Sequence, residues 1–490
     1  MYIDDYKRWL SADLEDPALT DELRKIAGQD NEIKERFAVA LKFGTAGLRG
    51  ILGAGSNRMN IYVVRQATQG LANWVKTQGG SQLVAISYDS RINSDVFARN
   101  AACVLVANGI RVRIYDALMP VPALSFATRY YKANAGIMIT ASHNPAKYNG
   151  YKAYGPDGCQ MTDDAAAVVY AEIQKTDILT GAKMMSFEDG IAQGLIEYVG
   201  KDCKEALYSA IEACAVRPGI CKTAGLKLVY SPLNGSGLVP VTRVLHDIGI
   251  DDITIVPEQQ YPDGNFPTCP YPNPEIFEAL RLGLELAEKT GADLMLATDP
   301  DADRVGIMVR TKEDDFVVIS GNQTGVLLLD YLIGAMKRSG KMPANPVALK
   351  TIVTTEMARK VAESNGVKCF DTFTGFKFMA EKKNALEESG EGKVIFSYEE
   401  SYGYMMGDYV RDKDAVTASM MIAEMAAYYF SKGMTLADAL EGLYEKYGWF
   451  MEKTLNLVMP GLDGLEKMKA LMANLRAKPC LLYTSDAADD

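Results

Sequence analysis

Residues 136–145 read Gly-Ile-Met-Ile-Thr-Ala-Ser-His-Asn-Pro, an apolar run followed directly by a polar loop. The apolar part is typical of a buried strand, which places the hydroxyl of Ser142 on a tight loop at the carboxyl end of that strand. Ligand sites in open α/β sheets gather at this edge, because loops there leave the sheet with free backbone N–H groups. Since Ser, Asn and Pro are also ordinary turn residues, the loop alone does not distinguish a site from a turn.

A second segment of the chain repeats this layout. The apolar run 294–297 is followed by Asp-Pro-Asp-Ala-Asp-Arg at 299–304. An EF-hand calcium loop would need Gly and Glu where Arg304 and Arg310 stand, so that alternative fails. A solvated acidic turn is the other alternative, but an arginine beside carboxylates favours a phosphoryl group. Alternate aspartates on an extended loop can point inward together and offer the oxygen ligands that Mg²⁺ prefers, which makes Asp299, Asp301 and Asp303 the predicted metal ligands.

The alternation of short apolar runs with longer amphipathic stretches predicts an α/β fold with parallel sheets. A chain of 490 residues is too long for one core. We expect several similar three-layer α/β/α domains around a central cleft, followed by an incomplete C-terminal α+β domain. The expected domains are 1–205 with a helical arm, 206–320, 321–448 and 449–490, and residues 480–490 resemble foreign sequence beyond which we expect the natural chain to continue.

Composition excludes several classes of partner. The formal net charge is −11, which disfavours binding to nucleic acid or to an anionic membrane. No apolar stretch approaches the roughly 20 residues that span a bilayer, and the start of the chain lacks the pattern of a signal peptide. The eight cysteines are scattered without a Cys-x-x-Cys pair, which indicates reduced thiols and a cytoplasmic location.

Three interpretations of Ser142 compete. A Ser–His–Asp hydrolase would need a Gly-x-Ser-x-Gly elbow, and the neighbouring His143 is not expected to point its ring at the serine. A turn or helix-capping serine needs no chemistry. A phosphorylated serine explains the aspartate loop, because a phosphate of charge near −2 would complete a Mg²⁺ site. We favour this third interpretation, in which His143 bonds the phosphate or tunes the serine.

Two cations lie in segments that suit phosphate binding. The segment 43–50 reads Phe-Gly-Thr-Ala-Gly-Leu-Arg-Gly, and its glycines allow close approach to an anion that Arg49 can grip. Lys152 follows Ser142 by ten residues and can return to the same site as a proton shuttle. A lysine held among cations has its pKa lowered toward neutrality, as acid–base work requires, although an ordinary surface lysine is the alternative.

These motifs together resemble the α-D-phosphohexomutase family. The matching segments are 43–50, 140–145, 299–304 and Glu-Glu-Ser-Tyr-Gly at 399–403, in the family's order and spacing, with Thr-Gly-Phe-Lys at 374–377 and Val-Arg-Asp-Lys-Asp at 410–414 as further similar segments. The resemblance covers roughly residues 40–450. The long N-terminal arm and the 399–403 segment are more similar to the phosphoglucomutase/phosphopentomutase branch than to bacterial phosphomannomutases.

The resemblance implies a role for each matching residue. Ser142 carries the phosphoryl group and completes the Mg²⁺ site of the three aspartates, while His143 and Arg304 support the phosphate. Lys152 is the general acid/base, with Lys377 as a second candidate, and Arg49 is counted with the catalytic residues. The implied substrate-binding residues are Thr45, Arg49, Arg304, Thr374, Gly375, Lys377, Glu399, Ser401, Arg411 and Lys413, of which Glu399 and Ser401 would hydrogen-bond sugar hydroxyls.

The implied reaction interconverts glucose 1-phosphate and glucose 6-phosphate, with Mg²⁺ and glucose 1,6-bisphosphate as cofactors and sugar phosphates as the only partners. No oligomeric state follows from the pattern. The family's Arg-x-Ser-Gly-Thr-Glu-Pro-type phosphate loop has no counterpart after residue 450. A non-catalytic sugar-phosphate-binding protein is therefore an alternative, beside a phosphopentomutase or a phosphomannomutase.

Overall fold

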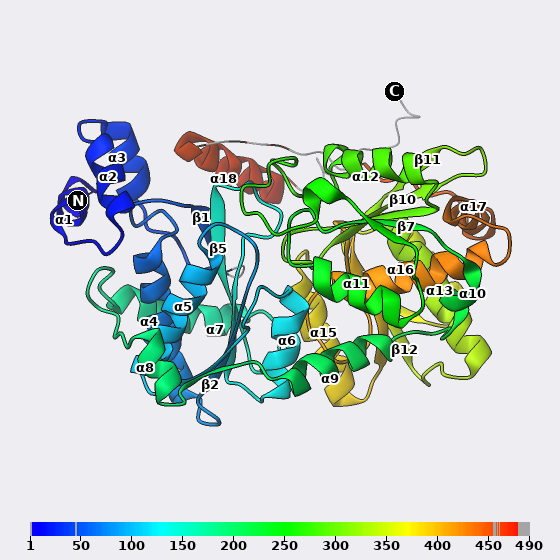
Figure 1. Cartoon of the computed structure of the whole chain (residues 1–490), viewed down its shortest axis with the longest axis horizontal. Coiled ribbons are helices and arrows are strands. Elements are labelled where there is room, and N and C mark those ends of the chain that lie inside the picture. Colours follow the sequence, from blue (N-terminus) through cyan, green and yellow to red (C-terminus); the bar gives the residue numbers. More distant parts are fainter. Residues whose placement is uncertain (1, 45–46, 454–456, 458, 460, 479–490) are drawn as a thin grey trace. The chain divides into compact units, whose positions relative to one another are not determined.

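The computed structural model describes residues 2–44, 47–453, 457, 459 and 461–478. The chain divides into two units, Met1–Trp449 and Phe450–Asp490. The first unit contains three sheets, each packed against helices (Figure 1). In the part of the chain with described structure, no helix is long and apolar enough to cross a membrane.

The expected N-terminal arm consists of three short helices. Trp9 and Leu23 are buried in a small apolar cluster that includes Tyr62 of the first helix beyond the arm. Arg65, on that same helix, donates to both carboxylate oxygens of Glu15 at 2.6 Å each, which ties the arm to the rest of the unit. The arm helices are α1 (Tyr2–Ser11), α2 (Pro17–Lys25) and α3 (Asp30–Phe37).

The first sheet has six strands in the order β1-β5-β4-β2-β3-β6. Strands β4, β2, β3 and β6 run parallel, as expected, but β5 is antiparallel to both of its neighbours. The cause is the loop at 140–147, which joins β4 directly to β5, and such a short connection can only pair antiparallel strands. The strands are β1 (Leu48–Ile51), β2 (Leu83–Tyr88), β3 (Arg111–Ile114), β4 (Ala135–Ile139), β5 (Tyr148–Tyr154) and β6 (Ile196–Tyr198), and the helices of this region are α4 (Ile61–Thr77), α5 (Ser94–Ala107), α6 (Val121–Tyr130), α7 (Asp163–Lys175), α8 (Phe187–Ala192) and α9 (Lys201–Glu212).

The second sheet repeats this design with five strands in the order β11-β10-β9-β7-β8. Strands β9, β7 and β8 are parallel, whereas β10 is antiparallel to β9 and to β11. The short connection from β9 to β10 is the aspartate loop. The strands are β7 (Leu228–Ser231), β8 (Ile253–Ile255), β9 (Leu294–Thr298), β10 (Val305–Arg310) and β11 (Phe316–Ile319), with α10 (Ile220–Ala224), α11 (Leu238–Asp247), the 3₁₀ turn η1 (Pro257–Gln259) and α12 (Phe277–Thr290).

The third sheet has four strands in the order β13-β12-β14-β15, of which only β15 is antiparallel to its neighbour. The short connection from β14 to β15 carries the Glu-Glu-Ser-Tyr-Gly segment. Each of the three motif loops therefore joins a buried strand to an antiparallel return strand. The elements are β12 (Pro346–Thr351), β13 (Lys368–Thr372), β14 (Lys393–Glu399), β15 (Gly403–Met405), α13 (Gly321–Ser339), α14 (Glu356–Ser364), α15 (Phe376–Ser389), α16 (Ala415–Phe430) and α17 (Leu436–Tyr447).

The described part of the second unit contains one helix, α18 (Gly461–Ala477). The segment 480–490, expected to be foreign sequence, lies outside the described residues. The seven described cysteines are all free, in agreement with the expected reduced thiols.

Candidate active site

Ser142 is buried in the loop between β4 and β5, with a left-handed backbone (φ 51°). Its N–H donates to Thr140 Oγ1 at 2.8 Å, and its Oγ donates to Asp299 Oδ2 at 2.9 Å. The Oγ also lies 3.1 Å from Nδ1 of His143, so the expectation that these neighbours point apart was wrong. The site still differs from a hydrolase triad, because the carboxylate contacts the serine directly.

The aspartate loop brings three buried carboxylates together. One oxygen from each of Asp299, Asp301 and Asp303 lies within 4.8 Å of the others. The backbone N–H groups of Asp303 and Arg304 donate to Asp299 Oδ1 at 3.1 and 3.0 Å, which curls the loop around that carboxylate. Burial and the two neighbouring carboxylates raise the pKa of Asp299 well above its usual value. For Asp301 burial acts in the same direction, but Lys152, the hydrogen bond with Asp299 and the charge of Lys413 together outweigh it, and the pKa is lowered.

The carboxylate cluster fits a divalent cation. Asp301 Oδ1 and Asp303 Oδ1 are buried and lack a hydrogen-bond partner among the described residues. A buried carboxylate oxygen without a partner is costly, and a bound cation removes that cost. Three carboxylates in a site that also holds a serine hydroxyl form an oxygen donor set of the kind that Mg²⁺ takes together with phosphate oxygens and water.

Two lysines balance the charge of the aspartates. Lys152 Nζ lies 2.9 Å from Asp301 Oδ2 and 3.6 Å from Asp303 Oδ2, while Lys413 Nζ lies 3.1 Å from Asp303 Oδ2. Burial acts to lower the pKa of Lys152, but the facing carboxylates outweigh it and the pKa is raised. The expectation of a lowered pKa was therefore wrong, because it considered the nearby cations and not the closer aspartates.

Arg304 links the aspartate loop to the loop after β14. Its Nη1 donates to Glu275 Oε1 at 2.7 Å, and its Nη2 lies 3.9 Å from Glu399 Oε1. Arg304 also forms an isolated β-bridge with Gly403, so the predicted sugar-binding loop lies against the predicted metal loop. Burial, followed by the charge of Arg304, lowers the pKa of His143 to about 2 in the free protein.

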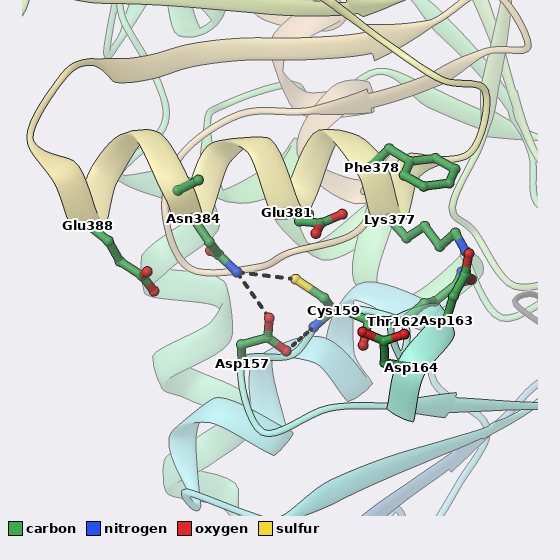
Figure 2. A pocket seen from close by; sticks show the side chains of 12 residues that line it. Asp157, Cys159, Thr162, Asp163, Asp164, Lys377, Phe378, Glu381, Asn384 and Glu388 are labelled. Atoms are coloured by element: carbon green, nitrogen blue, oxygen red, sulfur yellow. Dashed lines mark hydrogen bonds and ion pairs between the residues drawn. The ribbon is translucent and has the colours of Figure 1, made fainter. Parts of the chain in front are cut away.

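The predicted residues at 374–377 lie at the start of α15, where the ring centroid of Phe376 lies 5.6 Å from Nζ of Lys413. Thr374 and Gly375 are exposed, and Lys377 forms an ion pair with Asp163. Figure 2 shows the side chains of Lys377 and Asp163 meeting at a pocket between α15 and the segment 157–164. In this structure Lys377 is therefore neutralised by a carboxylate and does not contact the serine loop.

The remaining predicted residues are spread around the site. Arg411 is buried, and its Nε and Nη2 donate to Asn384 Oδ1 at 2.6 Å and Glu387 Oε2 at 3.0 Å, so the structure does not bring its guanidinium to the aspartates. Arg49, on β1, has an exposed side chain but lies close enough to the site for the charges of Asp301 and Asp303 to act on it. Ser401 is half-buried in the loop after β14, and Thr45 lies outside the described residues.

The sequence interpretation missed a group of residues behind the serine. Thr140 Oγ1 lies 2.6 Å from Asp89 Oδ2 and 3.1 Å from Asp301 Oδ2, and Arg91 contacts the backbone of the serine loop. The available signal was the polar segment 88–91, which follows an apolar run just as the two site motifs do.

Fold and site together define an α/β/α phosphoryl-transfer enzyme that combines a buried serine with an acidic loop suited to a divalent cation. The Phosphoglucomutase/phosphomannomutase family models for α/β/α domains I, II and III match residues 40–179, 209–312 and 320–447. The chain belongs to this family of α-D-phosphohexomutases, and it is an intramolecular phosphotransferase.

Curated relatives carry the same family assignment over most of the chain. A phosphoglucomutase of Staphylococcus saprophyticus is 33% identical over 447 residues, which are 91% of this chain and 80% of the relative. A phosphoglucomutase of Staphylococcus epidermidis is 35% identical over 447 residues, with the same coverage of both chains.

Solved structures share the fold. A crystal structure described as a putative phosphomannomutase of Thermus thermophilus has a TM-score of 0.70 and 24% identity, and covers 84% of each chain. The parafusin (phosphoglucomutase) of Paramecium in its open form has a TM-score of 0.65 and 18% identity, over 84% of this chain and 76% of that one.

Proposed function

We propose that this phosphohexomutase interconverts glucose 1-phosphate and glucose 6-phosphate, with Ser142 as the residue that carries the phosphoryl group. The observation that supports it most is the contact of Ser142 Oγ with Asp299 at 2.9 Å inside the buried aspartate cluster. The contact supports the proposal because a phosphate on Ser142 would lie beside the carboxylates proposed to hold the cation. The choice of glucose rests on relatives named phosphoglucomutase at 33–35% identity.

In the proposed reaction, a free sugar hydroxyl attacks the phosphorus of phosphorylated Ser142. The bond from phosphorus to Oγ breaks, the sugar hydroxyl loses its proton, and Oγ gains one, so a hexose 1,6-bisphosphate and a free serine result. Lys152, whose Nζ donates to Asp301 Oδ2 at 2.9 Å, is the proposed acid that supplies the proton to Oγ. The free carboxylates raise its pKa, so this role requires the pKa to fall when a cation binds those carboxylates. Transfer of the other phosphate back to Ser142 reverses these steps and releases the isomer.

Asp299, Asp301 and Asp303 would hold Mg²⁺ together with an oxygen of the serine phosphate. A bound Mg²⁺ neutralises charge on the phosphoryl oxygens, the principal requirement of phosphoryl transfer. Lys413 and Arg304 add fixed positive charge beside Asp303. Glu399, which lies close to Arg304, is placed to accept hydrogen bonds from sugar hydroxyls.

The proposed domains are 1–205, 206–320 and 321–448, followed by a further segment at 449–490. The three matched family ranges support the first three proposed domains, because each matched range lies inside the corresponding domain or extends one residue beyond it. The division of the chain after Trp449 supports the last boundary.

The test measures glucose 1-phosphate turnover with Mg²⁺ and catalytic glucose 1,6-bisphosphate, coupled to detection of glucose 6-phosphate. Intact-protein mass before and after exposure to the bisphosphate reports phosphorylation of Ser142. Turnover with glucose phosphate, and slower turnover with mannose and ribose phosphates, is the expected result. Preference for mannose or ribose phosphate would replace the proposed substrate, and phosphorylation at another residue would overturn the role of Ser142.

A further inference from the structure

One buried arginine, Arg91, holds the serine loop from behind. Its Nε donates to the carbonyl oxygen of Ser142 at 3.2 Å, and its Nη1 donates to the carbonyls of Pro145 and Tyr148 at 3.1 Å each. Its Nη2 donates to the carbonyls of Ser142 and Asn144. The Arg91 side chain has no solvent exposure. A single planar group therefore fixes the backbone from the serine to the start of β5.

This contact acts on the strained part of the loop. The left-handed backbone of Ser142 is strained for a non-glycine residue and persists only where surrounding contacts enforce it. Arg91 binds the carbonyl that follows the Ser142 Cα, and Thr140 Oγ1 accepts the N–H that precedes it. The two contacts together set the direction in which Oγ leaves the backbone.

The arginine is sealed by a loop from the second sheet's domain. The ring of Phe266 lies with its centroid 5.1 Å from Arg91 Cζ, and only 1% of Phe266 is exposed. At Gly264 a Cβ would lie 2.5 Å from the backbone N of Ile92 and 2.8 Å from the carbonyl O of Ser90, so only glycine lets this loop lie flat against the segment that carries Arg91. The carboxylate of Asp89, 3.5 Å from Nε, balances the buried charge.

We propose that Arg91, capped by Phe266, is a positioning residue that holds Ser142 Oγ in line for phosphoryl transfer without touching the substrate. The inference rests on the proposed role of Ser142. A lysine cannot replace the arginine, because one ammonium group cannot reach all the carbonyls that lie around the edges of the planar guanidinium. The proposal also assigns a role to the second domain's loop at 261–267, which stabilises the phosphoserine loop through the arginine.

The kinetic test compares Arg91→Lys and Phe266→Leu with a matched control, Arg217→Lys. The guanidinium of Arg217 also packs on aromatic rings, those of Tyr331 and Tyr428, at the far side of the second domain. Because misplacement of a reacting atom by about 1 Å can cost about 100-fold in rate, Arg91→Lys should lower kcat by about that factor while KM changes less than about twofold. Phe266→Leu should lower kcat by a smaller factor, and Arg217→Lys should leave kcat unchanged.

A second readout does not depend on turnover. Hydrogen–deuterium exchange of the 142–148 amides in substrate-free protein should be at least about tenfold faster in Arg91→Lys, since the loop loses its clamp, and unchanged in Arg217→Lys. If Arg91→Lys keeps the exchange rates and the kcat of the wild-type protein, the proposal is overturned. A rise in KM at constant kcat would also overturn it, because it would make Arg91 a substrate ligand. If the wild-type protein shows no turnover, the proposed function fails and the exchange data alone decide whether the clamp exists.

Discussion

The Ser142 hydroxyl contacts both Asp299 and His143, yet it contributes little to the packing of its loop. Ser142→Ala should therefore abolish turnover, with a fall in kcat of more than about 1,000-fold, while the melting temperature changes little. The coupled assay and a thermal melt measure the two quantities. Ser125→Ala is the matched control, because it removes another buried serine hydroxyl of the same domain and should leave kcat unchanged. Retention of more than a trace of activity in Ser142→Ala would refute the assignment.

Burial, followed by the charges of Asp301 and Asp303, raises the pKa of Asp299, so the cluster is costly when no cation is bound. Asp303→Asn should lower Mg²⁺ affinity by about 100-fold, because it removes one of few charged ligands. The same change should lower the melting temperature of the metal-free protein, because it leaves the buried Lys413 Nζ, 3.1 Å from Asp303 Oδ2, without its charged partner. Calorimetric Mg²⁺ titration and melts in a chelator measure the two effects. Asp314→Asn, in an exposed loop, is the control, and unchanged Mg²⁺ affinity in Asp303→Asn would exclude the triad as the metal site.

The strands and their following loops were predicted only in part from the sequence. The apolar runs before Ser142 and Asp299 correctly predicted buried strands ending in the site loops. The antiparallel return strands were not predicted, because a strand buried on both faces has the same apolar pattern whether it runs parallel or antiparallel. The only signal was the shortness of the loops, since a parallel connection needs a dozen or more residues.

Side-chain partners within the site were less predictable than the loops themselves. The aspartate cluster was predicted because its ligands share one short loop. Arg91 was missed because its partners are backbone carbonyls some 50 residues further along the chain, and no residue type marks a carbonyl acceptor. The environment of Lys152 was misjudged for a similar reason, since Asp301 and Asp303 reach it from a different sheet.

The ion pair between Lys377, at the start of α15, and Asp163 should affect substrate binding. Lys377 is held by Asp163 at the beginning of α7, so a substrate phosphate must displace that carboxylate before it can use the lysine. Asp163→Asn should lower KM for the sugar phosphate by up to about fivefold, the scale of an exposed ion pair. Asp164→Asn removes the same charge from the next position of the helix and should change KM less. Steady-state kinetics at low ionic strength measure the difference, and equal effects of the two variants would show that only net charge matters.

Residues from all three sheets meet at the site, so its geometry depends on how these parts of the first unit are joined. Ser142 and Lys152 come from the first sheet, Asp299 from the second and Glu399 from the third. Away from the site, Arg217 joins the second and third parts: its Cζ lies 4.0 Å from the ring centroid of Tyr428 and 4.7 Å from that of Tyr331.

Arg217→Met should therefore weaken the junction without altering the chemistry. Loss of a cation–π contact on two rings should cost about 1–2 kcal/mol and lower the urea midpoint of unfolding, while kcat per folded molecule stays constant. Arg338→Met is the matched control, because that guanidinium lies 5.7 Å from the same Tyr428 ring and should contribute less. A parallel loss of kcat in Arg217→Met would instead show that the junction sets the distance between the phosphoserine loop and the sugar-binding loop. An unchanged urea midpoint would show that apolar packing, and not the arginine, holds these two parts together.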